Sequence, residues 1–463
     1  MIKYVCTTLL IAASIIAKAQ TTNDSTFIKK IYDEALVNGK AYNSLRYLCK
    51  QIGNRVSGST AMYKAEAWGL QTLKEYKADT VYSQLCTIPH WVRGAKEEAS
   101  YKWSSTTAGN LQTAEKTVEI LSLGNAIGTN GTVLKAPLLI VKNFDDLEAQ
   151  KENVKGKIVY YNYAFNQTFV RTFNAYSDAV KYRVQGAARA AKYGAVAVIV
   201  RSVSSANDNN PHTGVQQYND TITNIPAVAI GIQDGDNLSQ LYKNGKVLFS
   251  LKTNATMLPD TVANNIIAEI KGSENPKQII TIGGHLDSWD IGEGAHDDGA
   301  GIVQSMEIIN LFKTLGYQPK HTIRVVLFAN EENGARGADK YAELTTLNNE
   351  TNIAAIESDA GGFTPRGFGG SMNDEQYKKF KSWLTLLQQY GISEMSRGGG
   401  GTDIEPLAEK YKTPTISLIP DSQRYFDVHH SRNDVFEAVN KRELHLGAAG
   451  MAALVYLLDQ YGL

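Results

Sequence analysis

The second half of the chain alternates strand-like and helix-like segments with a regularity that few folds can satisfy. Short apolar runs predict strands, and apolar positions at helical spacing predict helices between and after them. The expected strands are 263–270, 278–284, 322–330, 353–358 and 414–419, and the expected helices are 298–315, 334–347, 374–390 and 441–460. This order favours an α/β fold, a doubly wound and mostly parallel sheet with helices on both faces. Ligands of such sheets bind at the carboxyl ends of the strands.

The length of 463 residues predicts more than one domain. In the first part of the chain we expect helices at 24–52 and from Ser59 or Thr60 to about 74, then strands near 80–90, 98–104 and 116–122. Segment 130–255 follows a cluster of Gly, Asn and Thr and has strands and helices of its own, but no plausible catalytic set. His212 lies alone in its Asn- and Asp-rich loop, where we expect it to be solvated. We therefore predict an insert domain at 130–255, which shapes or covers a site formed by a main domain of 20–129 and 256–463.

The N-terminus predicts export. Lys3 precedes an apolar run from Val5 to Ala17, and Ala17-Lys18-Ala19 offers small residues before a cut ahead of Gln20. Segment 1–19 is therefore expected to be a cleavable signal peptide and the mature protein to be secreted or periplasmic, without a membrane anchor. Lys+Arg and Asp+Glu balance at 47 each, which does not favour a nucleic-acid partner. Cys49 and Cys86 remain after cleavage, either paired or free.

The stretch from Gly283 to Gly301 concentrates ionisable side chains directly after the strand predicted at 278–284. His285 and Asp287 are two residues apart, so they point to the same side of an extended segment. Asp287 could accept the second ring N–H of His285 and leave the other nitrogen free for a metal. Asp297 and Asp298 lie where the next helix begins. Capping that helix would explain one of these aspartates but not both.

Later strands end in further ligand-type residues. Glu331 and Glu332 follow the strand at 322–330, Asp359 follows the strand at 353–358, and His430 comes late in the chain. Adjacent carboxylates of an extended segment point in opposite directions, so one can bind a metal while the other handles a proton. Two solvated surface glutamates are the alternative.

Counted together, the ligand candidates are His285, Asp297, Glu332, Asp359 and His430. Imidazole and carboxylate ligands without thiolates suit zinc in a catalytic site. Five ligands are too many for one tetrahedral zinc with an open position. They suffice for two metals if one carboxylate bridges.

In order and approximate spacing, these residues resemble the co-catalytic zinc metallopeptidase family of aminopeptidases and glutamate carboxypeptidases. Three segments resemble its carboxypeptidase Q (plasma glutamate carboxypeptidase) branch: Gly284-His285-Leu286-Asp287-Ser288-Trp289-Asp290, Gly401-Thr402-Asp403-Ile404-Glu405-Pro406-Leu407, and the stretch from Ile52 to Ser59. Region 130–255 resembles the protease-associated domain of that branch. The resemblance thus implies a zinc peptidase domain with an inserted protease-associated domain.

The resemblance also implies a role for each residue. His285, Asp297 and Glu332 would bind one Zn²⁺, and Asp297, Asp359 and His430 a second, with Asp297 as the bridge. Glu331 would be the general base that acts on a metal-activated water. Asp287 would orient His285, and His429 would stabilise the oxyanion. The implied protein is a homodimeric exopeptidase that hydrolyses dipeptides or short peptides. Ile404 departs from the Ser-Asp-His of related aminopeptidases, so their substrate contacts do not transfer.

Two other functions remain as alternatives. One is a glutaminyl cyclase on the same scaffold, which uses a single zinc for acyl transfer. The other is a receptor-like binding protein without catalysis, although such proteins lack the ligand set that is present here. The preference among aminopeptidase, dipeptidase and carboxypeptidase activity stays open.

Overall fold

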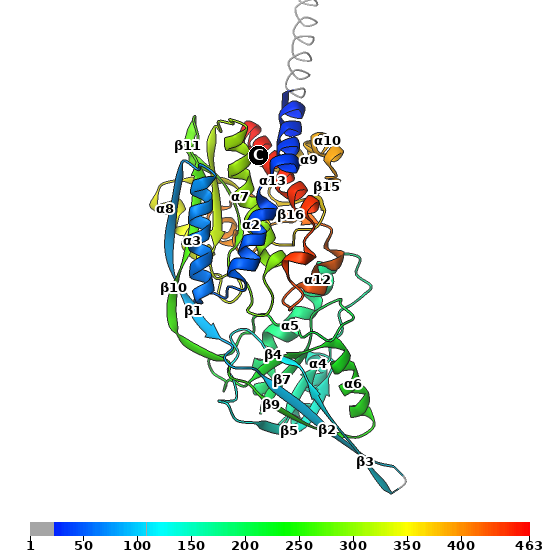
Figure 1. Cartoon of the computed structure of the whole chain (residues 1–463). Coiled ribbons are helices and arrows are strands. Elements are labelled where there is room, and N and C mark those ends of the chain that lie inside the picture. The colour runs from blue at the N-terminus through cyan, green and yellow to red at the C-terminus, as the bar shows by residue number, and fades with distance from the viewer. Residues whose placement is uncertain (1–22, 108) are drawn as a thin grey trace, which may run out of the picture.

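The structure is a computed structural model that describes residues 23–107 and 109–463, so the expected signal peptide at 1–19 lies outside the described residues. The chain forms two lobes, each built on an eight-stranded sheet (Figure 1). Among the described helices, none is long and apolar enough to cross a membrane. Cys49 and Cys86 are both buried and free, so they do not pair.

The first sheet carries the fold that the strand and helix pattern predicts. Its strand order is β1-β10-β12-β11-β13-β16-β14-β15. The strands are β1 (Thr80–Val92), β10 (Thr256–Ile270), β12 (His321–Phe328), β11 (Asn275–His285), β13 (Thr351–Glu357), β16 (Thr415–Pro420), β14 (Pro365–Ser371) and β15 (Glu394–Arg397). The central strands β12, β11, β13 and β16 are parallel to one another. Strands β1, β10 and β14 pair antiparallel at the flanks.

Helices cover both faces of this sheet, as a doubly wound fold requires. One face packs against α7 (Ala300–Thr314), α13 (Lys441–Tyr461), α2 (Ala41–Tyr47) and α3 (Thr60–Glu75), whose apolar residues join those of the strands in one buried cluster. The other face packs against α8 (Arg336–Leu347) and α11 (Glu405–Tyr411) around Phe328 and Tyr341. Residues of α7 from Ala300 to Phe312 are all buried, which explains its nearly continuous apolar sequence.

Several expected elements differ in extent. The helix expected at 24–52 is divided into a helix at 23–38, α2 and a π-helical turn, Leu48–Ile52. The break lies at Gly39, where a Cβ atom would clash with the ring of His445. The helix expected at 374–390 is divided into α9 (Asp374–Ser382), α10 (Leu384–Leu387) and a 3₁₀ turn. The pattern missed α11 and the glycine-rich strand β14, whose sequence lacks a clear apolar periodicity.

The second sheet has the order β3-β2-β9-β5-β6-β7-β8-β4. Its strands are β3 (Asn110–Val118), β2 (Glu98–Thr107), β9 (Lys246–Lys252), β5 (Leu134–Val141), β6 (Ile158–Tyr161), β7 (Ala197–Arg201), β8 (Ala227–Ile230) and β4 (Ile120–Ser122). Helices α4 (Phe144–Ala149), α5 (Thr172–Ala191) and α6 (Ile232–Lys243) complete the lobe. Strands β2 and β3 extend from it as a ribbon (Figure 1).

The second sheet includes strands that precede the insert expected at 130–255. Strands β2, β3 and β4 were expected in the main domain, but β2 pairs with β9 and β4 pairs with β8. The alternation of polar and apolar residues that identifies β2 as a strand does not specify its partner. The insert therefore begins after β1, and β9 ends it close to the expected boundary at 255.

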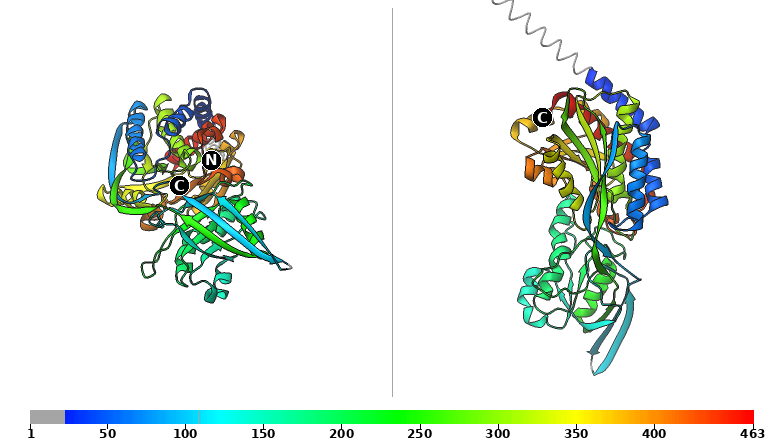
Figure 2. Two further views of the ribbon diagram at one scale, coloured as in Figure 1. Left: turned by 60° about the horizontal axis from the view of Figure 1, so that its bottom comes forward. Right: turned by 90° about the vertical axis from the view of Figure 1, so that its left-hand side faces the viewer.

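The two lobes are connected by a two-stranded ribbon. Strand β1 leads out of the main sheet and β10 leads back, and they remain paired as far as Val92 and Thr256. Figure 2 shows this ribbon running from one lobe to the other. Both connections to the insert therefore leave the main sheet at the same place.

Candidate metal centre

The ligand candidates meet because three parallel strands end side by side. Strand β11 lies between β12 and β13 and ends at His285. The turn after β12 carries Glu331 and Glu332, and Asp359 lies two residues beyond the end of β13. His430 arrives from the segment after α12 (Tyr425–Val428).

Asp297 lies between two groups of ligand atoms. Its Oδ1 is 3.2 Å from His285 Nε2, which is also 3.5 Å from Asp359 Oδ1. Its Oδ2 is 3.1 Å from His430 Nε2, which is also 3.2 Å from Glu332 Oε2. The two oxygens of one carboxylate thus face two separate groups, as a bridging ligand requires.

The division of the remaining ligands corrects the expected one. Asp359 groups with His285, and Glu332 groups with His430, whereas the expected division pairs Glu332 with His285 and Asp359 with His430. Strand β13 borders β11, so its end places Asp359 beside His285. The turn after β12 carries Glu332 past His285 toward His430. The order of strands in the sheet decides this grouping, and the order of residues in the chain does not reveal it.

The donor set fits divalent metal ions. Metal–ligand bonds of 2.0–2.1 Å in a tetrahedral site place neighbouring ligand atoms about 3.3 Å apart, close to the separations above. Three carboxylate oxygens, Asp297 Oδ2, Glu332 Oε1 and Asp359 Oδ1, are buried without a hydrogen-bond partner among the described residues. Leaving such groups unsatisfied is costly, so these oxygens are suited to a cation.

Charge and burial set the protonation of this cluster. Burial alone would raise the pKa of Asp297, but the imidazoles of His285 and His430 hold that pKa well below its usual range. Burial, reinforced by the Asp297 charge, raises the pKa of Glu332 to about 8. Burial also raises the pKa of Glu331 to about 7.

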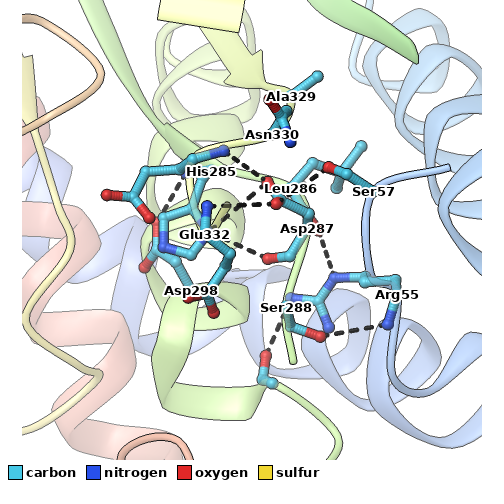
Figure 3. Close-up of polar contacts among 12 residues, drawn as sticks. Arg55, Ser57, His285, Leu286, Asp287, Ser288, Asp298, Ala329, Asn330 and Glu332 are labelled. Carbon is cyan, nitrogen blue, oxygen red and sulfur yellow. Dashed lines mark hydrogen bonds and ion pairs between the residues drawn. The ribbon is translucent and has the colours of Figure 1, made fainter. Parts of the chain in front are cut away.

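His285 is oriented by Asp287, as expected, but through the backbone carbonyl of Asp287 and not through its carboxylate. Its Nδ1 lies 3.0 Å from the backbone carbonyl oxygen of Asp287 and 3.9 Å from the carboxylate, so the carbonyl is the acceptor. The Asp287 carboxylate instead accepts hydrogen bonds from the Ser57 hydroxyl and from the backbone N–H groups of Glu331 and Glu332. Figure 3 shows Asp287 between Ser57 and Glu332. Asp287 therefore fixes both the first ligand and the turn that carries the two glutamates.

Arg55, for which the sequence predicted no role of its own, supports the stretch from Gly283 to Gly301. Its guanidinium, fully buried, donates to the carbonyl oxygens of Leu286, Glu293 and Gly294. Figure 3 shows Arg55 beside Leu286. Arg55 lies in the stretch from Ile52 to Ser59, so the resemblance of that stretch was the available signal.

Two further carboxylates bind the backbone of the ligand segments. Asp434 accepts the backbone N–H groups of His296 and Asp297, and Asp298 accepts those of His285 and Gly301. Asp298 thus supports both the end of β11 and the start of α7.

His429 and His212 lie against the second ligand group. The His429 ring stacks on His430 with centroids 3.5 Å apart, and its Nε2 is 3.5 Å from Asp297 Oδ2. His212 was expected to be solvated, which is wrong: it is buried, with Nδ1 2.6 Å from the His429 carbonyl oxygen. The loop that carries it folds onto the metal centre, a long-range contact that its polar sequence does not indicate.

A cavity of about 640 Å³ opens beside Asp359. The peptidase lobe contributes Leu418 and Ile419 of β16 and Thr402 of the turn before α11 to its walls, and the insert contributes Val170 and Phe173. Both lobes therefore shape the space next to the candidate metal centre.

Comparison with known proteins agrees with this fold and site. The model of "Peptidase family M28" matches residues 265–455, and that of the "PA domain" matches residues 129–238. Human carboxypeptidase Q is 36% identical over 92% of this chain and 86% of its own length. Carboxypeptidase Q of Xenopus laevis is also 36% identical, over 95% of this chain and 91% of its own.

Solved structures show the same architecture. A peptidase M28 precursor from Shewanella amazonensis superimposes with a TM-score of 0.88 at 29% identity, over 95% of this chain and 97% of that one. A zinc aminopeptidase from Bacillus subtilis shares the fold, with a TM-score of 0.64 at 22% identity over 90% of this chain and 94% of that one. The chain belongs to peptidase family M28, in its carboxypeptidase Q branch, with a peptidase domain interrupted by a PA domain. Its class is that of a zinc-dependent metallo-exopeptidase, which excludes the receptor-like alternative.

Proposed function

We propose that this protein hydrolyses dipeptides or short peptides with two Zn²⁺ ions and with Glu331 as general base. The observation that carries the proposal is the position of Asp297, whose two oxygens face two ligand groups of one imidazole and one carboxylate each. Glu331 is adjacent in sequence to a member of one group and lies near His285 and Asp359.

Bound zinc would polarise the scissile carbonyl and acidify a water molecule. Glu331 takes the proton of the attacking water and returns it to the leaving amine. Its backbone is held by Asp287, and its carboxylate is hydrogen-bonded to the Thr402 side chain. A pKa near 7 suits a base that must both accept and release a proton at neutral pH.

His429 is proposed to donate to the developing oxyanion. Burial holds the pKa of His429 well below its usual value, so the ring is neutral and keeps one N–H to donate. Its Nε2 edge faces Asp297 and hence the centre of the site.

The cavity beside Asp359 supports a short substrate. Its volume of about 640 Å³ lies in the range of small-molecule sites. Arg171 and Arg366 on its walls are each paired with a carboxylate of the same walls, Glu394 and Asp421. Such a cavity accommodates a few residues of either end of a peptide.

A panel of dipeptides, each free and blocked at either end, tests this function. We expect hydrolysis of the free dipeptides, its loss on chelation and its recovery with zinc. The block that abolishes turnover identifies the terminus that the enzyme recognises. Cyclisation of a peptide with N-terminal Gln, without dipeptide hydrolysis, would contradict the proposal in favour of the cyclase alternative.

We further propose that the mature enzyme starts at Gln20 after export and that it is a homodimer. The sequence of segment 1–19 supports the first point, and the resemblance to the carboxypeptidase Q branch supports the second. N-terminal sequencing of protein from the culture medium or periplasm, and sedimentation of the purified protein, check them. A mature chain that retains Met1, or one monomeric species, would contradict them.

A further inference from the structure

The two ligand imidazoles are oriented by different lobes. His285 directs Nδ1 to the carbonyl oxygen of Asp287 in its own segment, at 3.0 Å. His430 Nδ1 lies 3.2 Å from the carbonyl oxygen of Thr213 and 3.4 Å from Arg183 Nη1, and both residues belong to the insert. The carbonyl is the shorter contact and can only accept, so it favours a proton on Nδ1. In each ring a proton on Nδ1 leaves the lone pair of Nε2 for a metal, which is the usual function of such an outer partner.

Thr213 also fixes the backbone of His430. The Thr213 N–H donates to the His430 carbonyl oxygen at 2.9 Å, so the two residues exchange hydrogen bonds. His430 adopts a φ of 58°, in the left-handed region that residues with side chains rarely occupy. A backbone in this conformation persists where its surroundings hold it.

Glu332, the other ligand grouped with His430, is also positioned by residues of the insert. Asn125 donates through Nδ2 to the Asn333 carbonyl oxygen at 3.0 Å, and Asn333 donates through Nδ2 to Asn125 Oδ1 at 3.2 Å. Asn333 directly follows Glu332. The insert thus forms hydrogen bonds with the turn that carries Glu332 as well as with the segment that carries His430.

These contacts come from two insert segments, 122–126 and 212–216, which we call the insert clamp. The segments are joined to each other: Gly124 N–H donates to the Gly214 carbonyl oxygen at 2.9 Å, and Gln216 N–H donates to the Gly124 carbonyl oxygen at 3.0 Å. A Cβ on Gly214 would lie 2.6 Å from His430 Nδ1, and a Cβ on Gly124 would lie 1.8 Å from the Trp289 ring. The clamp therefore packs backbone directly against the metal centre.

The other ligand group has no such dependence. The polar contacts of His285 within the described chain run to Asp287, Asp297, Asp298 and Asp359, all in the peptidase domain. Asp359 follows a central strand of the same domain. The two halves of the centre are therefore built differently, one by the peptidase domain alone and one by both lobes.

We infer that the insert clamp is part of the metal site formed by His430 and Glu332, and that this site binds metal at full affinity only with the clamp docked. The inference rests on the proposed two-metal centre. Thr213 and Asn125 are positioning residues for this site alone. Loss of an outer partner of this kind costs roughly 10–100-fold in metal affinity, and the site formed by His285 and Asp359 should be spared.

Zinc titration of the metal-free protein tests the inference, with calorimetry as readout. The variant is Asn125→Gly, because Asn125 has a φ of 62° that glycine adopts without strain. We expect two zinc ions per wild-type chain, and in the variant a 10–100-fold weaker affinity for one of them only. Asn130→Gly is the matched control, an exposed insert asparagine with a φ of 53°, and should bind zinc as the wild type does.

Combining Asn125→Gly with the loss of one ligand histidine identifies which of the two metal sites is affected. In His285→Ala the remaining zinc should be weakened by Asn125→Gly, whereas in His430→Ala the remaining zinc should be unaffected. Weakening in the His430→Ala background, or unchanged affinities in Asn125→Gly, would overturn the inference while leaving the two-metal function intact. A single zinc per wild-type chain would instead overturn the proposed two-metal centre.

Gly214→Ala is a second test of the inference, because its new Cβ would lie 2.4 Å from the guanidinium carbon of Arg183 and 2.6 Å from His430 Nδ1. The clash would disturb the contact of His430 with the Thr213 carbonyl. Its control is Gly156→Ala, which also places a side chain at a positive φ (75°, against 129° at Gly214) but has no atom within 4 Å of the new Cβ. Equal circular dichroism spectra of the metal-free proteins show that each variant is folded. If Gly214→Ala does not fold, Asn125→Gly decides alone.

Discussion

The carboxylate of Asp287 accepts the backbone N–H of Glu331 at 3.1 Å, across 44 residues of sequence. The same carboxylate accepts the N–H of Glu332 and the hydroxyl of Ser57. One buried carboxyl group therefore fixes the turn on which the proposed base and a proposed ligand lie side by side.

Asp287→Asn should lower both activity and stability. The amide replaces one acceptor oxygen by a donor, which would face the N–H of Glu332 or the Ser57 hydroxyl. An unsatisfied buried group costs about 1–3 kcal/mol. Chemical denaturation and kcat of the variant check this, and Ser57→Ala, which removes one donor only, should show the smaller effect in both measurements.

Glu331→Gln and Glu332→Gln should separate catalysis from metal binding. We expect Glu331→Gln to retain both metals and lose about 10²–10⁴-fold in kcat, the usual contribution of a general base. We expect Glu332→Gln to lose one metal equivalent. Elemental analysis beside kcat measures both. Near-normal turnover of Glu331→Gln would contradict its assignment as the base.

Glu307 should make stability depend on pH. It is buried in α7, and burial raises the pKa of its carboxyl to about 7, above the ordinary 4.5. Between about pH 4.5 and 7 the folded state therefore retains this proton while the unfolded state has released it. The free energy of unfolding should fall as the pH rises through this range. Relative to wild type, Glu307→Gln should gain stability over this range, by at most about 3 kcal/mol at pH 8. Urea denaturation at pH 4.5 and 8 measures the gain, which the exposed control Glu409→Gln should not show.

Arg55→Met should destabilise the peptidase domain. The substitution keeps much of the buried volume but leaves the carbonyls of Leu286, Glu293 and Gly294 without their donor. We expect a loss of about 2–4 kcal/mol, since each buried unpaired carbonyl is costly. Thermal unfolding checks it against Arg46→Met, an exposed arginine of α2 whose replacement should change little.

The ligand residues could be predicted from sequence because parallel strands present their carboxyl ends at one edge. A polar residue directly after each buried strand, such as His285, Glu332 or Asp359, then lies at that edge, close to the others. Their grouping could not be predicted, since it depends on β11 lying between β12 and β13. The contact of Thr213 with His430 spans 217 residues and involves a carbonyl that any residue carries. No local pattern specifies such a contact, and the same is true of the pairing of β2 with β9.

The ribbon of β1 and β10 constrains the order in which the chain can fold. Pairing Val92 with Thr256 in an unfolded chain closes a loop of about 160 residues, at an entropic cost of roughly 4–5 kcal/mol. Once the insert has formed, Glu98 and Lys252 are already neighbours, and only short connections remain to be ordered. The insert is thus expected to fold before the peptidase sheet closes, and it then serves as the nucleus that brings the two separated parts of that sheet together.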